Sequence, residues 1–251
     1  MSITIKSIKG YYFLDAWIFA NIIQQATLVF CKKHLNLKND PCGRMFDQMT
    51  MAARSAVANI AEGSSRRQTS KETEMKLTDV ARASLSELLG DYFSFSLANN
   101  VTPWLKESDN YKNFNLIQLA PPNYTSNIEY DAWMRIKNEY QKFAPWIEHQ
   151  SIDVCLNSLM MLINRTISML QKMIGAQLDT FKQEGGFTEN LTQERRESQI
   201  QQAEQGSAPS CPVCGGVMIK HVAKRCANSG ACIAVVGVQN NGQAGWFSFL
   251  S

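Results

Sequence analysis

The sequence predicts an all-α protein: an antiparallel, up-and-down four-helix bundle with a long insertion between its third and fourth helices and a small cysteine-rich tail. Four long stretches carry apolar residues at spacings of three and four, the period of a helix with one buried face. Strand signals are nearly absent before the tail. A short link joins the second and third stretches, which favours antiparallel neighbours.

The composition is that of an ordinary globular protein. Of 251 residues, 45% are hydrophobic and 19% are charged, which excludes a chain disordered throughout. Lys and Arg number 25 against 22 Asp and Glu, so bulk attraction to nucleic acid or acidic lipid is not expected. No apolar run approaches the roughly 20 residues that span a bilayer, and no secretion signal opens the chain. We therefore expect a cytoplasmic protein without a membrane partner.

The first two helices follow from this apolar rhythm. The first is predicted over residues 13–35 and is broken between residues 40 and 43, where Pro and Gly occur. The second is predicted over residues 44–62, with a middle rich in Ala and Ser that lets a neighbouring backbone approach. Gly63 is expected to be its C-cap, because glycine adopts the left-handed conformation without a Cβ penalty.

The third and fourth helices complete the predicted bundle. The third is expected from Thr69, with Glu72 as its capping-box partner, to about Ala98. The fourth is the clearest, because its apolar rhythm continues over residues 152–181, a rod of about 45 Å. Ser151 can cap its start, and the Gly185-Gly186 pair is expected to end it.

Residues 99–150 form the insertion between the third and fourth helices. Residues 130–143 can form one short helix within it, and Trp104, Trp133 and Trp146 make it rich in aromatic rings. A segment of this composition is unlike a flexible linker. We expect it to pack on one end of the bundle or to cover a partner.

One stretch resembles a known protein family. Residues 52–63 read AARSAVANIAEG and are followed by Arg66 and Arg67, and then by Lys71 and Glu72. The bacterial four-helix-bundle proteins encoded in intervening sequences of 23S ribosomal RNA genes carry a similar small-residue helix, basic turn and Lys-Glu helix start. The resemblance implies an all-α bundle.

The resemblance covers residues 10–100 and 150–183, whereas the insertion departs from the compact family pattern. The same fold includes accessory proteins of diversity-generating retroelements. These are barrel-shaped homopentamers with basic surfaces, which bind a reverse transcriptase and nucleic acid. A bundle followed by a cysteine-rich tail is similar to their subgroup with a C-terminal suffix domain. The resemblance therefore implies a homo-oligomer, pentameric in that family, with a polymerase as a possible partner.

Seven cysteines divide into two groups. Cys31, Cys42 and Cys155 stand singly among apolar neighbours and are expected to be buried free thiols. The other four lie close together after a polar helix or linker at residues 187–209, in a tail at residues 210–251; they are Cys211, Cys214, Cys226 and Cys232. An odd total argues against a disulfide scaffold.

The start of the tail, CPVCGG at residues 211–216, resembles the first half of the C4 zinc ribbon at the C-terminus of bacterial type IA topoisomerases. That resemblance implies Cys211 and Cys214 as Zn²⁺ ligands. It does not extend to the second half, because no Pro-x-Cys element follows Cys232. A shifted reading frame or a decayed module is one explanation, which the coding DNA would test.

The residues themselves support a zinc site of less regular spacing. Zinc takes about four nitrogen or sulfur ligands, usually as two close pairs. Cys211 and Cys214 form one pair, and Cys226 with Cys232 forms the other, with His221 as a substitute. The alternative is a damaged site that keeps its thiols without holding metal firmly. So small a tail needs the metal to fold alone.

The tail also carries the whole net charge. Its bases are Lys220, Lys224 and Arg225, with no acid after Cys211, so residues 1–210 are neutral. These bases are candidates for phosphate contacts, with Trp246 or Phe247 able to stack on a nucleic-acid base. The alternative is a merely soluble surface.

A second basic spot lies at the turn between the second and third helices, at Arg66, Arg67 and Lys71. Residues 43–100 hold seven bases and seven acids, so the spot is weak in one subunit, and repetition in an oligomer would strengthen it. A solvated turn with local salt bridges is the alternative.

The sequence offers little catalytic chemistry. It contains no phosphate-binding glycine loop, Ser-His-Asp pattern or metalloprotease helix, and Asn59 and Glu62 are better explained by hydrogen bonds between helices or at the turn. We therefore expect a non-enzymatic, nucleic-acid-binding oligomer. The alternative is a protein-interaction scaffold that docks a partner through the insertion aromatics Trp104, Trp133 and Trp146.

Overall fold

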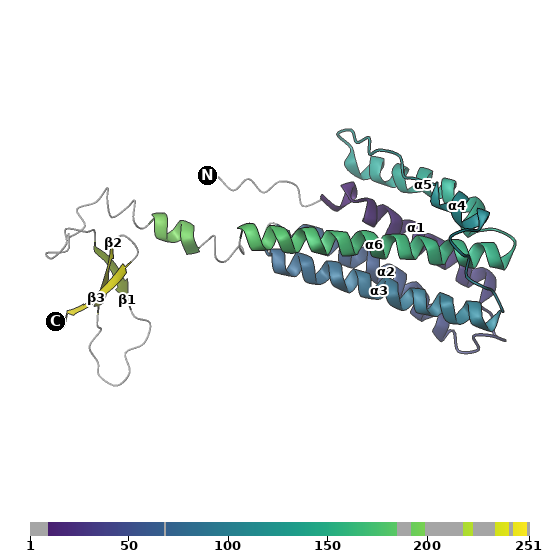
Figure 1. The fold of residues 1–251 in the computed structure, drawn as a ribbon, viewed down its shortest axis with the longest axis horizontal. Coiled ribbons are helices and arrows are strands. Elements are labelled where there is room, and N and C mark those ends of the chain that lie inside the picture. Colours follow the sequence, from purple (N-terminus) through teal and green to yellow (C-terminus); the bar gives the residue numbers. More distant parts are fainter. Residues whose placement is uncertain are drawn as a thin grey trace. The chain divides into compact units, whose positions relative to one another are not determined.

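The structure is a computed structural model, and it describes residues 10–67, 69–184, 192–198, 218–222, 234–240 and 243–249. It divides into two units, Met1–Gly186 and Phe187–Ser251 (Figure 1). We call the first the helical unit and the second the C-terminal unit.

Every regular element described in the helical unit is a helix, which confirms the all-α class there. The elements are η1 (Gly10–Phe13), α1 (Asp15–His34), α2 (Arg44–Arg66), α3 (Lys71–Ala98), α4 (Asp109–Asn115), α5 (Ile128–Ile147) and α6 (Ile152–Glu184). The four long stretches predicted from the apolar rhythm correspond to α1, α2, α3 and α6.

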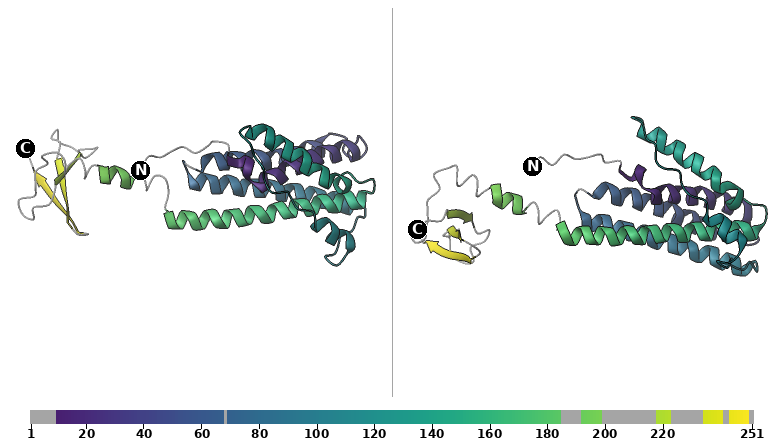
Figure 2. Two further views of the ribbon diagram at one scale, coloured as in Figure 1. Left: turned by 90° about the horizontal axis from the view of Figure 1, so that it is seen from above. Right: turned by 45° about the horizontal axis from the view of Figure 1, so that its top comes forward.

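The four long helices enclose one core. Each packs against two of the others, α1 against α2 and α6, and α3 against α2 and α6 (Figure 2). At its centre, Phe30 of α1 meets the rings of Tyr92 and Phe95 of α3, with centroids 5.0 and 5.2 Å away. The buried Tyr92 hydroxyl donates to Thr27 Oγ1 at 3.0 Å, so this phenol is not buried without a hydrogen-bond partner.

Hydrogen bonds and close contacts identify one end of the helical unit. A Cβ atom on Gly10 would lie 3.6 Å from Ser64 Oγ, which places η1 beside the end of α2. Gln177 Nε2 of α6 donates to Glu74 Oε1 of α3 at 3.1 Å, so α6 finishes beside the start of α3. We call this the turn end: η1, the α2–α3 turn and the last turns of α6.

Two predicted helix boundaries are wrong by a few residues. Gly63 is no C-cap, since α2 continues to Arg66. A Cβ there would lie 3.2 Å from both Glu74 O and Leu77 Cβ of α3, so the glycine instead permits close helix packing. The N-cap of α3 is Ser70 rather than Thr69, because Ser70 Oγ accepts the N–H of Thr73 at 3.1 Å.

The insertion packs along the flank of the helical unit, against α1 and α6, and not on one end as one alternative had it (Figure 1). Its helix α5 is longer than predicted, with Pro145 in its last turn. Arg165 of α6 holds the insertion by donating to the carbonyl oxygens of Ile117 and Asn115 at 2.8 and 3.3 Å. The Arg165 guanidinium thus lies at the C-terminal end of α4, where a cation interacts favourably with the last carbonyl groups of a helix. These bonds stabilise the insertion in its position along the flank.

The three single cysteines are free, but only two are buried. Cys31 and Cys155 lie in the core, whereas Cys42 is exposed, which corrects the prediction for that residue. Cys42 belongs to the α1–α2 link, which is exposed over most of its length. Burial raises the pKa of Cys31 to about 12 and that of Cys155 to about 11.

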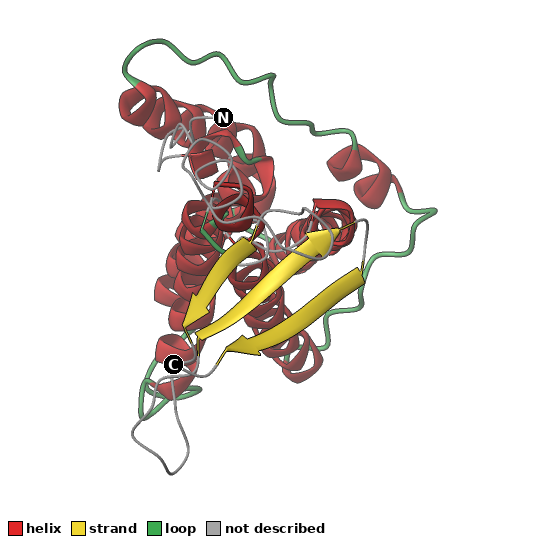
Figure 3. Cartoon of the chain, turned by 90° about the vertical axis from the view of Figure 1, so that its left-hand side faces the viewer, coloured by secondary structure: helices red, strands yellow, loops and turns green. Residues whose placement is uncertain are grey.

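The C-terminal unit contains an exposed helical turn at residues 192–198 and an antiparallel sheet (Figure 3). The strands are β1 (Met218–Val222), β2 (Ala234–Asn240) and β3 (Gln243–Phe249), in the order β1-β2-β3. Val222 pairs with Ala234, and Asn240 pairs with Gln243. Cys211, Cys214, Cys226 and Cys232 lie outside the described residues.

Candidate nucleic-acid interface

The predicted basic spot lies on the α2–α3 turn. The carbonyl oxygen of Arg66 accepts the N–H groups of Thr69 and Ser70 at 2.9 and 2.8 Å, so the backbone of the turn is closed on itself. Arg66 and Arg67 are exposed, and Lys71 is half-buried in the first turn of α3. The turn therefore presents three cations within one short segment at the turn end.

Acidic side chains stand close to these cations. Glu62 Oε1 lies 3.7 Å from Arg66 Nη2, with both side chains more than half exposed. Burial raises the pKa of Glu74, and the nearby Arg67 and Lys71 partly oppose that rise. The positive charge of the turn is thus partly balanced by nearby acids, as predicted by the equal numbers of acids and bases over residues 43–100.

The structure adds a cation that the sequence analysis missed. Lys182 lies in the last turn of α6 and is exposed. Gln177, five residues earlier, donates to both Glu74 and Thr78 of α3, so this last turn belongs to the turn end. The antiparallel order of the helices was the signal that could have found Lys182, since it brings the fourth helix back to the α2–α3 turn.

Most residues proposed for the tail site lie beyond the described ranges. Lys220 lies on β1, an edge strand of the sheet, whereas Lys224, Arg225 and the four tail cysteines fall outside those ranges. Among the described residues, no group of three His, Cys, Asp or Glu side chains is placed to hold a metal ion. The Zn²⁺ prediction therefore stays a prediction.

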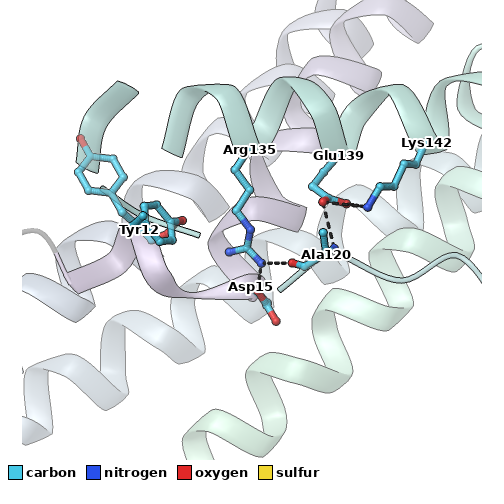
Figure 4. Close-up of polar contacts among 7 residues, drawn as sticks. Tyr12, Asp15, Ala120, Arg135, Glu139 and Lys142 are labelled. Atoms are coloured by element: carbon cyan, nitrogen blue, oxygen red, sulfur yellow. Dashed lines mark hydrogen bonds and ion pairs between the residues drawn. The ribbon is translucent and has the colours of Figure 1, made fainter. Parts of the chain in front are cut away.

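A second polar cluster ties the insertion to α1 (Figure 4). Arg135 Nη2 donates to Asp15 Oδ1 at 2.5 Å and to the carbonyl oxygen of Ala120 at 3.2 Å. Glu139 Oε1 accepts the Ala120 N–H at 3.0 Å and is paired with Lys142. Each bond joins α5 to the preceding segment, to α1 or to its own next turn. The cluster therefore explains the packing of the insertion.

The insertion tryptophans divide between packing and exposure. The ring of Trp104 meets that of Trp146 at 6.1 Å, and the backbone N–H of Trp104 donates to Asn157 Oδ1 at 2.7 Å. Trp146 also packs against Phe114. Trp133 alone among these three is an exposed residue, at 57%. Only Trp133 keeps the docking role considered for all three.

Asn59, considered for catalysis, takes part in packing. Its Nδ2 donates to Ser55 O at 2.8 Å and to Ser55 Oγ at 3.0 Å. The Ser55 hydroxyl in turn lies 3.0 Å from Ser84 Oγ, and this bond joins α2 to α3.

No protein-family model, curated protein or solved structure matches the chain. None of the described helices has the combination of length and apolar character that a bilayer-spanning helix requires.

Proposed function

We propose that this protein is a non-enzymatic, oligomeric accessory protein that binds RNA or DNA through the turn end of its helical unit and through its C-terminal unit. One observation carries the proposal. Arg66, Arg67 and Lys71 lie at the end where α6 finishes with Lys182. From that end the chain continues into the segment that holds its whole net charge.

The local acids do not prevent phosphate binding. Exposed ion pairs such as Glu62–Arg66 contribute little to the free energy of folding, so a phosphate can replace the carboxylate at small cost. A polyanion gains affinity from every counterion it releases. In a homo-oligomer each protomer adds the same cations, so a patch that is weak once becomes multivalent. A pentamer, as the family resemblance implies, would present five copies.

The finer description of the fold belongs to the same proposal. We infer that the four long helices form an up-and-down four-helix bundle of the 23S ribosomal RNA intervening-sequence type. The AARSAVANIAEG stretch and the basic turn after it support this relationship. A cytoplasmic location fits an unpaired, exposed thiol such as Cys42.

Zinc binding by the tail is a further part of the proposal. Cys211 and Cys214 precede β1, whereas Cys226 and Cys232 lie between β1 and β2. The chain therefore enters β1 at one end and leaves it at the other, about 13 Å away for a five-residue strand. Binding of one ion by all four thiols would have to bridge that length.

Charge-removal variants test the turn end. The variant R66Q/R67Q/K71Q should weaken binding of a labelled RNA. It should also lower the slope of log affinity against log salt by about 1 for each phosphate that the protein no longer binds. The matched control K32Q/K33Q/K38Q removes three exposed charges in and just after the last turn of α1, away from the turn end. Equal behaviour of the two variants would refute a role for the turn.

Deleting residues 205–251 tests the tail separately. We expect weaker binding with a smaller salt slope, because three cations per protomer leave with the tail. Full affinity in the truncated protein would show that the tail makes no nucleic-acid contact.

The second candidate function is a protein-interaction scaffold that docks a partner such as a reverse transcriptase. The exposure of Trp133 and Tyr130, both 57%, favours it. The internal packing of Trp104 and Trp146 weakens it, because those rings already have partners.

A further inference from the structure

One face of α5 is open to solvent and carries aromatic rings beside a cation. The opposite face is buried through Ala132, Phe143 and Ile147. On the open face Tyr130 and Trp133 are each 57% exposed, and Lys137 Nζ lies 5.1 Å from the centre of the Trp133 ring. We call Tyr130, Trp133 and Lys137 the aromatic stripe, since their spacings of three and four put them on one side of the helix.

The aromatic stripe lies in the half of α5 that begins beside η1. Tyr124, just before α5, donates its hydroxyl to the carbonyl oxygen of Tyr12, and its ring lies 4.6 Å from that of Phe13. Phe13 itself is 44% exposed. Since η1 packs against α2, exposed rings and the basic turn belong to the same end of the helical unit.

The chemistry of this face fits one class of ligand. Exposed aromatic rings, one of them carrying an ammonium group over its ring, match a base with its neighbouring phosphate. A protein partner would favour a continuous apolar surface, whereas the exposed neighbours of the stripe include the acidic Glu129 and the polar Asn138 and Gln141. In a duplex the bases are already stacked and offer no free face.

We propose that the aromatic stripe of α5 stacks the bases of single-stranded RNA or DNA whose phosphates are held at the turn end. This inference rests on the proposed function and deepens it, because it specifies unpaired nucleic acid as the ligand.

The test compares a labelled 20-nucleotide single strand with a duplex of equal length by fluorescence anisotropy at low salt. Y130S/W133S should bind the single strand at least tenfold more weakly, as expected when stacking platforms are lost, and the duplex within twofold of wild type. The control L97S/L105S removes two apolar side chains that are 65% and 72% exposed and should change neither affinity.

Each outcome bears on a separate claim. Unchanged single-strand affinity, or an equal loss for both ligands, overturns the stacking inference and leaves the proposed function standing. Wild-type protein that binds neither ligand overturns the proposed function and this inference together.

A second measurement does not depend on the folding of the double variant. Poly(U) should quench part of the tryptophan emission of the wild type, and W133F should lose that part while it keeps most of its affinity. Quenching of the same size in W133F would contradict stacking on Trp133.

Discussion

Two charged residues, the buried Arg135 and the half-buried Asp91, show how a single side chain can stabilise or destabilise the fold. The Arg135 side chain is only 8% exposed, and its ion-pair partner Asp15 is 47% exposed. The Nε and Nη1 atoms of Arg135 have no hydrogen-bond partner among the described residues. Compensation for the guanidinium comes from its Nη2 contacts to Asp15 and Ala120 and from the nearby Tyr124, which also favours the charged form.

Breaking this ion pair should destabilise the protein. D15A leaves the Arg135 charge buried, and we expect a loss of about 1–2 kcal/mol, less than the 3–5 typical of a fully buried pair because Asp15 is half exposed. R135M should cost less, since it removes the buried charge itself. D79A, which breaks the exposed Asp79–Arg82 pair, should cost under about 0.5 kcal/mol. Urea unfolding measures all three; equal losses for D15A and D79A would contradict the account.

Asp91 presents the opposite case, a carboxylate without compensation. Its Oδ2 is buried with no hydrogen-bond partner in the described part of the chain. Burial, and then the nearby Glu87, raise the pKa of Asp91. A carboxyl group whose folded pKa is raised favours the fold while it is protonated, and this contribution is lost as the pH rises through the folded pKa.

D91N should therefore stabilise the protein at pH 7. The expected gain is about 0.2–0.5 kcal/mol, the size of a like-charge pair four residues apart on a helix. It should shrink as the pH falls and vanish about one unit below pH 4, where the carboxyl group is protonated in both states. Thermal melts of both proteins between about pH 4 and pH 8 measure this. A gain that grows towards low pH has the wrong sign for this explanation.

At the scale of elements, two helical glycines allow the effect of close helix packing to be separated from that of helix propensity. Gly63 of α2 approaches the backbone of α3, whereas a Cβ on Gly90 of α3 would meet nothing within 4 Å. G63A should cost about 1–3 kcal/mol through overpacking. G90A should stabilise by up to about 1 kcal/mol through helix propensity. Chemical denaturation compares them, and the same sign for both would show that contact with α3 is not what selects Gly63.

The sequence predicted the long helices well because their signal is local. The rhythm of Leu85, Leu88 and Tyr92, all fully buried, is visible within one stretch. The placement of the insertion was not predictable in this way. It depends on bonds such as Arg135–Asp15, which join residues 120 positions apart. Nothing in the local composition distinguishes the packed Trp104 from the exposed Trp133.

The candidate site was likewise predicted only in part. Arg66, Arg67 and Lys71 are close in sequence, so the turn was visible from the residues alone. Lys182 was missed because its relation to that turn is a property of the folded chain. The tail ligands were predicted from cysteine spacing alone, and that prediction awaits a metal measurement.

At the scale of the whole molecule, assembly and metal content decide whether weak patches can act together. Native mass spectrometry should show a homo-oligomer with zinc bound in proportion to its protomers, because small cysteine-rich units need metal to fold. The C211S/C214S variant should lose zinc and keep its oligomeric state, which we assign to the helical unit. A wild-type oligomer without zinc would contradict the proposed metal site. A monomer would contradict the proposal that repeated copies of the basic turn bind nucleic acid together.

The most direct test of the central claim is an anisotropy titration of labelled single-stranded RNA with the full-length wild-type protein at about 50 and 200 mM salt. Binding through several cations per assembly predicts tight association at the lower concentration and a steep loss of affinity, of about tenfold or more, at the higher one. No binding at the lower salt concentration, or an affinity that ignores salt, would contradict the claim that this protein holds nucleic acid by its phosphates.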